Sequence, residues 1–216
     1  MLNQILNNLQ STDTQLIAVS KTHPPEKILE IYQQGQKVFG ENKALELADK
    51  YKVLPKDIEW HFIGHLQSNK VKYIAPFVQL IHGIDSFKLL KEINKQAKKN
   101  DRIIDCLLQF HIAEEQTKFG LDIAGAKDIL ASSEYKILEN IRIIGVMGMA
   151  TFTKDKVQVR REFKLLESIF QKLKNDFFQD TPAFKEISMG MSGDYLLAVE
   201  EGSTMVRVGS LIFGKR

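Results

Sequence analysis

The chain has 216 residues, of which 44% are hydrophobic and 26% charged, with 30 basic and 27 acidic side chains and a formal net charge of +3. This balance is typical of a globular protein with a sizeable core, and it gives no argument for a basic nucleic-acid-binding surface or a membrane span. The one cysteine, Cys106, excludes a disulfide framework within the chain and a Cys-x-x-Cys metal motif, which fits a reducing, cytoplasmic location.

The first predicted element is an amphipathic helix at the N-terminus. Its apolar residues fall at the i, i+3, i+4 and i+7 positions of one helical face: Leu2, Ile5, Leu6 and Leu9. The segment lacks a basic region followed by a continuous apolar core, so it does not resemble a secretory signal peptide.

After this helix, short apolar runs alternate with helical patterns. The runs predict strands at 16–20, 37–40, 60–64, 80–84, 103–110, 141–147, 184–189 and 205–209, the last continuing to 212–213. Helical patterns follow near 25–35, 44–48, 71–74, 86–97, 123–130, 163–173 and 194–199. Strand–helix alternation predicts a parallel sheet, and eight units favour a closed (β/α)₈ TIM barrel over an open doubly wound sheet.

The domain organisation is predicted to be simple. The sequence shows no linker, internal repeat or low-complexity segment, so we expect a single domain over residues 1–216. About 250 residues are typical of a TIM barrel, so the loops of this one must be short.

A lysine ends the first predicted strand. In a TIM barrel the carboxyl ends of the strands form the active face, so Lys21 would point toward the barrel mouth. Partial burial lowers the pKa of a lysine because desolvation disfavours the ammonium ion. A neutral amine can form a Schiff base with an aldehyde. An ordinary solvent-exposed lysine is the alternative.

Glycine and serine are frequent in the loops that follow the last two predicted strands. The segments are Ser188–Asp194 and Arg207–Ser210, and TIM barrels often bind phosphate at these two loops. An ordinary helix cap at Ser192 or Asp194 is the alternative. An amine and a phosphate site in one mouth indicate a phosphorylated aldehyde. Pyridoxal 5′-phosphate (PLP) fits, and so does the substrate of a Schiff-base sugar-phosphate aldolase.

Five motifs in order cover nearly the whole chain: "AVSKTHP" at 18–24, "FGEN" at 39–42, "WHFIGHLQSNK" at 60–70, the Glu115…Lys118…Gly120 spacing, and "SMGMSGDYLLAVEEGSTMVRVGSLIFG" at 188–214. With these motifs the sequence resembles the pyridoxal phosphate homeostasis proteins, the YggS/PROSC family. The fold of that family is similar to the N-terminal barrel domain of alanine racemase.

The resemblance implies a cofactor site for PLP and no metal. Lys21 would hold PLP as an aldimine, Asn42 would lie beside the ring, and Arg207 would face the ring nitrogen. The phosphate would be held by Ser188, Ser192, Gly193, Gly209 and Ser210. Met147 and His65 complete the expected cofactor-binding set, with His65 either lining the pocket or serving a structural role. The sequence departs from the family pattern at His111, which replaces a small amide, and at Ser210, where threonine is common.

The same residues bear on whether the protein is an enzyme. A racemase needs a second base opposite the lysine, and by resemblance alanine racemase takes a tyrosine from a separate domain for that role. The chain ends at Arg216, soon after the last predicted strand, so we expect no such domain, and we expect Tyr195 to be used in packing.

The preferred hypothesis is therefore a monomeric PLP-binding protein of intracellular PLP homeostasis, which stores, buffers or delivers PLP, with PLP-dependent apoenzymes as candidate recipients. The alternatives are a low-activity amino-acid racemase using Lys21 with water or His65, and the aldolase. A nucleic-acid-binding module is the least favoured.

Overall fold

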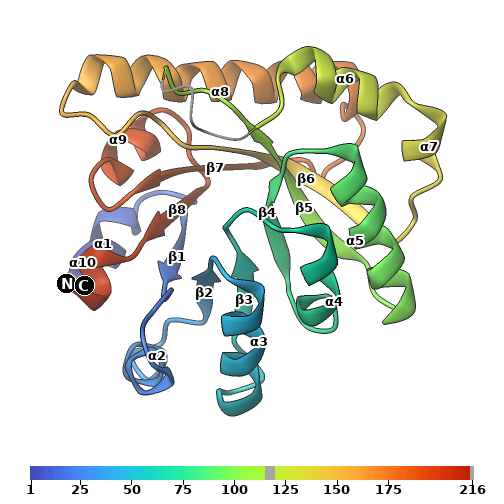
Figure 1. The fold of residues 1–216 in the computed structure, drawn as a ribbon. Helices are drawn as coiled ribbons and strands as arrows, with labels where there is room; N and C mark the ends of the chain where they lie inside the picture. The colour runs from blue at the N-terminus through green and yellow to red at the C-terminus, as the bar shows by residue number, and fades with distance from the viewer. Residues whose placement is uncertain (115–119, 215–216) are drawn as a thin grey trace.

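The computed structural model describes residues 1–114 and 120–214, and these form a closed barrel of eight parallel strands (Figure 1). The strands are β1 (Gln15–Val19), β2 (Val38–Glu41), β3 (Glu59–Phe62), β4 (Leu80–Ile84), β5 (Ile104–Phe110), β6 (Ile141–Gly148), β7 (Glu186–Met191) and β8 (Met205–Val208). They neighbour one another in chain order, and β1 pairs with β8 to close the ring, with Leu16 opposite Val206. The predicted (β/α)₈ barrel is confirmed.

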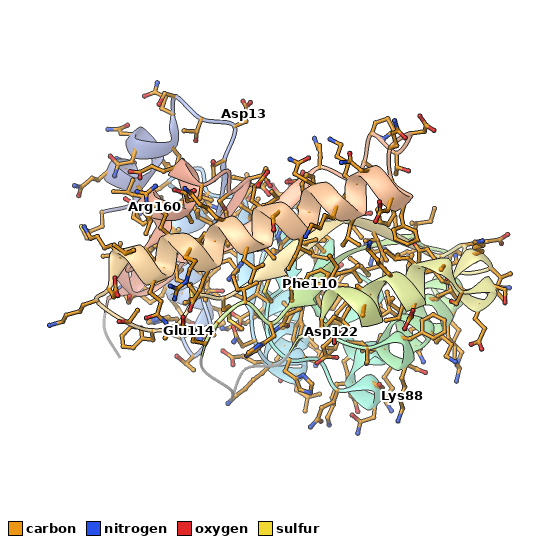
Figure 2. All side chains as sticks on the ribbon, turned by 90° about the horizontal axis from the view of Figure 1, so that it is seen from above. Asp13, Lys88, Phe110, Glu114, Asp122 and Arg160 are labelled. Carbon is orange, nitrogen blue, oxygen red and sulfur yellow. The ribbon has the colours of Figure 1, made fainter. Side chains whose placement is uncertain are left out.

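Helices cover the outside of this barrel (Figure 1). They are α1 (Leu2–Leu9), α2 (Pro25–Tyr32), α3 (Ala44–Val53), α4 (Val71–Ile74), α5 (Phe87–Lys99), α6 (Ile123–Ala131), α7 (Ser133–Lys136), α8 (Lys156–Phe177), α9 (Tyr195–Glu200) and α10 (Ser210–Phe213), with a 3₁₀ turn at Ser68–Lys70. Seen from above, α6 runs beside the long helix α8 (Figure 2). Within the described ranges, none of the helices has the length and apolar character needed to cross a membrane.

Helix α8 shows why the sequence forms these elements. Asp155 begins it by accepting hydrogen bonds from the amides of Val157 and Gln158. An apolar stripe at helical spacing then faces the barrel and is buried: Val159, Phe163, Leu166, Phe170 and Leu173. Phe170 stacks on Phe184, with ring centroids 5.0 Å apart. This contact fixes the helix against the segment that leads into β7.

The barrel interior is apolar at one end and polar nearer the mouth. A packed apolar group fills the lower part, contributed by six strands: Ile17, Val38, Leu80, Leu107, Ile144, Met147 and Met205. Two residues further along their strands, His82 and Arg207 also point inward, because side chains alternate along a strand. Polar groups therefore occupy the layer directly below the mouth.

The packing of helix α1 against β8 shows which way the Arg207 side chain points. Val206 and Val208 pack on the outside of β8 in one buried cluster with Leu2, Ile5 and Leu9 of α1. Arg207, between the two valines, therefore faces the barrel interior. The same cluster contains the buried Tyr195, whose hydroxyl accepts a hydrogen bond of 2.8 Å from Asn8. The expectation that Tyr195 is used in packing is confirmed.

The prediction for residues 210–213 was wrong. The sequence indicated a continuing strand, but β8 ends at Val208 and Ser210–Phe213 form the helix α10. The amides of Ile212 and Phe213 both donate to the carbonyl of Gly209, at 2.8 and 3.0 Å. A run of four mostly apolar residues fits either element, and here α10 packs Leu211 and Ile212 against the α1 cluster.

Candidate functional site

A cavity of about 630 Å³ opens at the carboxyl ends of the strands. Loops after β1, β2, β3, β6, β7 and β8 contribute its wall. Seven of the residues expected from sequence line it: Lys21, Asn42, Ser192, Gly193, Arg207, Gly209 and Ser210. The fold thus brings the amine, the cation and both glycine–serine loops to one cavity.

Lys21 lies between two residues that are anchored to α3. The Ser20 hydroxyl donates to Glu41 Oε1 at 2.7 Å, and the Ser20 carbonyl accepts from Lys50 Nζ at 2.9 Å. The amide of Thr22 donates to Glu46 Oε1 at 2.6 Å. Thr22 has a φ of 67°, in the left-handed region that non-glycine residues seldom adopt. These contacts hold the turn that presents Lys21, which is half-buried.

The anchor itself is a buried ion cluster. Lys50 Nζ lies 2.6 Å from Glu41 Oε1 and 2.7 Å from Glu46 Oε1, and the Lys50 and Glu41 side chains are almost completely buried. Burial raises the pKa of Glu41, although Lys50 and Ser20 oppose the rise. Burial also acts to raise the pKa of Glu46, but hydrogen bonds from Lys50 and the Thr22 amide outweigh it, so that pKa is lowered.

Arg207 supplies a buried cation at the cavity floor. Its Nη1 donates to the Ser188 hydroxyl at 2.6 Å, and its Nη2 donates to the Gly148 carbonyl at 3.0 Å. Burial lowers the pKa of Arg207 to about 10, and the negative charge of Asp194 partly offsets this effect. The guanidinium therefore stays charged at neutral pH.

Below Arg207, polar side chains continue into the barrel. His82 Nδ1 lies 2.9 Å from Ser188 Oγ, and His82 Nε2 lies 3.1 Å from His61 Nδ1. Burial lowers the pKa of His61 to about 3. Burial, together with the positive charge of Arg207, holds the pKa of His82 well below its ordinary value. Both imidazoles are therefore neutral at physiological pH.

The two glycine–serine loops are joined at the cavity wall. Ser192 Oγ accepts a hydrogen bond of 3.3 Å from the amide of Gly209. Asp194 precedes α9 without capping its amides, and instead accepts from the Met191 amide at 2.6 Å. The alternative of an ordinary side-chain cap at this helix is therefore wrong. A Cβ added at Gly193 would meet no atom within 4 Å, so the backbone there is open to a ligand.

Asn42 carries an unsatisfied acceptor on the same wall. Its Oδ1 is buried, and within residues 1–114 and 120–214 it has no hydrogen-bond partner. A buried polar atom without a partner costs roughly 1–3 kcal/mol, and a donor on a bound ligand would remove this cost. Together with Lys21, Arg207 and the open backbone at Gly193, this acceptor fits a ligand that carries a carbonyl carbon, an anion and a hydroxyl.

Three other predicted site residues lie away from the cavity wall. The His65 side chain is 48% exposed and its Nδ1 lies 3.0 Å from Asp85 Oδ2. Met147 packs in the apolar lower layer. Ser188 is completely buried beneath Arg207. Strand β6 continues past Met147 to Gly148, and β7 continues past Ser188 to Met191. The side chains of Met147 and Ser188 therefore lie below the mouth.

Several cavity residues were not among the predicted site residues. They are Val19, His23, Ile63, Met149, Thr151, Phe152, Thr153, Met191, Asp194, Leu211 and Gly214. Each of them ends a strand or lies within six residues after one, so the position of strand ends could have identified them. His23 stacks its ring on Phe213 at 4.9 Å. The departure at His111 does not line the cavity, and the Glu115 and Lys118 positions lie outside the described residues.

Comparison with known proteins agrees with this geometry. The family model for the alanine racemase N-terminal domain matches residues 2–216. A curated pyridoxal phosphate homeostasis protein of Aquifex aeolicus is 41% identical over 203 residues, covering 93% of this chain and 86% of the relative. Its counterpart in Homo sapiens is 36% identical over 220 residues, covering 97% and 79%.

Solved structures give the same picture. PipY of Synechococcus elongatus, solved with PLP bound, superposes with a TM-score of 0.85 at 33% identity, covering 99% of this chain and all of that one. Alanine racemase from Bartonella henselae, with covalently bound pyridoxal phosphate, superposes with a TM-score of 0.73 at 16% identity, covering 99% of this chain and 61% of that one. The second likeness shows the barrel fold alone.

Proposed function

The chain belongs to the alanine racemase N-terminal domain family and to the pyridoxal phosphate homeostasis proteins, and from this premise we propose that it binds PLP on Lys21 and acts in intracellular PLP homeostasis. The observation that carries the proposal is the convergence of Lys21, Arg207 and the 192–193 and 209–210 loops on one cavity. The PLP-bound structure of PipY supports it. Residues 1–216 would form one PLP-binding domain.

The chemistry of the cofactor fits the residues present. Bound PLP supplies an aldehyde, which condenses reversibly with an amine as a carbon–nitrogen double bond forms and water leaves. Among the residues that the structure describes, Lys21 is the lysine that lines the cavity. Backbone amides and hydroxyls of Ser192, Gly193, Gly209 and Ser210 would hold the phosphate. The unpartnered Asn42 Oδ1 would accept from the ring hydroxyl.

Arg207 argues for holding PLP rather than strongly activating it. A guanidinium beside the pyridine nitrogen disfavours protonation of that nitrogen, because like charges repel. An unprotonated ring withdraws electrons less well, so it stabilises carbanions poorly. Tight but chemically quiet binding suits storage, buffering or delivery to PLP-dependent apoenzymes by a monomeric protein. If the protein showed a weak racemase activity, the alternative of a low-activity racemase would replace this binding role.

The first test is the visible absorbance of the protein before and after borohydride. With PLP, we expect a yellow band in the native chain that borohydride removes, leaving the cofactor covalently attached to Lys21. Lys21→Arg keeps the positive charge but removes the reactive amine, so it should give no fixed label. Lys43→Arg, an exposed lysine next to Asn42, is the matched control and should label normally.

Two results would count against the proposal. Labelling that persists at another lysine in Lys21→Arg would reject Lys21 as the attachment point. Rapid exchange of an amino acid's α-hydrogen with deuterated solvent by the loaded protein would favour a catalytic role over a binding role. No band at all would reject PLP and make a sugar phosphate the next ligand to test.

A further inference from the structure

Arg207, Ser188, His82 and His61 form a continuous chain of hydrogen bonds across the barrel interior. They come from β8, β7, β4 and β3, and each is at most 4% exposed. The contacts are 2.6 Å from Arg207 to Ser188, 2.9 Å from Ser188 to His82 and 3.1 Å from His82 to His61. Ser188, His82 and His61 do not line the cavity, so direct ligand contact does not explain them.

The direction of each hydrogen bond follows from Arg207. An arginine side chain can only donate, so the Ser188 hydroxyl oxygen accepts from it. Among the contacts of the described residues, the proton of that hydroxyl then has His82 Nδ1 as its acceptor. A neutral His82 that accepts at Nδ1 carries its proton on Nε2 and donates to His61 Nδ1. In each of these three hydrogen bonds, the donor is therefore the residue nearer Arg207, and the acceptor is the next residue along the chain toward His61.

This order fixes the guanidinium. The guanidinium of Arg207 is planar, and two of its nitrogens donate hydrogen bonds, one to Ser188 Oγ and one to the Gly148 carbonyl. Two bonds from two nitrogens set both the position and the plane of the group. Arg207 also lines the cavity, so fixing its guanidinium fixes a cation at the cavity floor. A serine hydroxyl that could rotate freely would hold the guanidinium less well than one whose proton is held by His82.

We propose that Ser188 and His82 are positioning residues for Arg207, which hold its guanidinium in the orientation that faces the ring of a cofactor carried by Lys21. The part that concerns the cofactor rests on the proposed function, whereas the hydrogen-bond order and the fixed guanidinium do not. This assigns Ser188 a role beneath Arg207 instead of the phosphate contact that the sequence resemblance implied.

The first arm of the test uses the protein without added cofactor. Nitrogen-15 NMR should show His82 and His61 as neutral rings protonated on Nε2, and the Arg207 side-chain N–H signals should exchange slowly with water. Ser188→Ala removes a hydrogen bond to the Arg207 guanidinium, and His82→Leu removes the acceptor that holds the Ser188 hydroxyl. Each variant should therefore make the Arg207 signals exchange at least about tenfold faster. His82→Asn, whose side-chain oxygen can replace Nδ1 as the acceptor, should restore slow exchange.

The second arm uses the loaded protein. Ser188→Ala and His82→Leu should shift the visible band and weaken PLP binding about tenfold, and His82→Asn should do neither. Leu107→Ala is the control, because it opens a cavity in the apolar lower layer without touching the chain of hydrogen bonds. It should lower the melting temperature and leave the band unchanged.

Specific results would overturn the proposal. It fails if His82 is protonated on Nδ1, if Arg207 exchange is unaltered in Ser188→Ala and His82→Leu, or if Leu107→Ala shifts the band as they do. If the native protein takes up no PLP, the proposed function fails, while the NMR arm still decides whether Ser188 and His82 position Arg207.

Discussion

Arg207 and Asn42 define the chemistry of the cavity at the scale of single residues. Arg207 is a cation held under the mouth by Ser188 and Gly148, and Asn42 offers a buried acceptor that the described residues leave unpaired. Both features destabilise the folded protein when no ligand is bound, because charges and polar atoms are costly to bury. They are the features expected of a site that is completed by a ligand.

Asn42→Leu separates the two contributions of that acceptor. Removing a buried polar group that has no partner costs the folded protein little, and can stabilise it. We therefore expect the ligand-free protein to melt at the same or a higher temperature, while PLP binds about tenfold more weakly for the loss of one hydrogen bond. Thermal melting and a PLP titration measure the two effects. Unchanged affinity with a lower melting temperature would contradict this assignment.

At the scale of elements, helices secure the loops that form the cavity wall. The anchor of α3 to the turn around Lys21 runs through Lys50, Glu41 and Glu46. Helix α8 does the same for the loop after β6, through the buried Glu162. The Glu162 carboxylate accepts from the amide and hydroxyl of Thr151, at 2.6 and 2.7 Å. It also accepts from the Glu114 amide at 3.1 Å, and Glu114 lies beside the N-terminal half of α8 (Figure 2).

This contact predicts a pH dependence of stability. Burial acts to raise the pKa of Glu162, but the hydrogen bonds from Thr151, Gln158 and Glu114 outweigh it and lower that pKa below its ordinary value of 4.5. A carboxyl with a lowered folded pKa stabilises the fold above its unfolded pKa and loses this contribution as the pH falls through the folded value. Glu162 should therefore stabilise the protein at neutral pH and cease to do so in acid below pH 4.5.

Glu162→Gln tests the prediction. The variant should be less stable than the native chain by about 1–3 kcal/mol at pH 7, and the difference should shrink as the pH is lowered below 4.5. Urea unfolding at a series of pH values measures it. Glu167→Gln, on the same helix but away from Thr151, is the control and should show a much smaller difference. A gap that stays constant from neutral to acid pH would show that the charge of Glu162 is not what matters.

At the scale of the whole molecule, the barrel is closed but its mouth is built for a ligand. Loops from six of the eight strands meet there, and they join segments as distant in sequence as Lys21 and Ser210. A ligand that touches several of these loops binds the folded chain and not the unfolded one. Binding must therefore raise the apparent stability of the entire barrel.

Thermal melting with added PLP measures this coupling. At a free PLP concentration near 100 times the dissociation constant, the gain is about 2.7 kcal/mol. For a domain of this size such a gain corresponds to a rise of roughly 5–10 °C in melting temperature. Lys21→Arg should show a much smaller rise, and Lys43→Arg the full one. An equal rise in Lys21→Arg would mean that phosphate contacts alone account for binding.

The sequence by itself determined the architecture and the approximate position of the site. Strand and helix periodicities are local signals, and eight of each in alternation leave few folds other than a closed barrel. Because parallel strands bring their carboxyl ends to one face, Lys21 at the end of β1 and the glycine–serine loops after β7 and β8 could be placed together before any contact was known. The short apolar run 210–213 had no such signal, and its helical form depends on packing against α1.

Only the tertiary structure decided how the site is supported. The contact between His82 and Ser188 joins residues 106 positions apart, and the one between Ser188 and Arg207 joins residues 19 apart. Neither pair shares a local pattern, so no periodicity in the chain announces them. Whether Arg207 faced inward also depended on Val206 and Val208 finding α1 on the outside. Contacts of this kind arise from ring closure and packing, which bring distant residues together only once the barrel has formed.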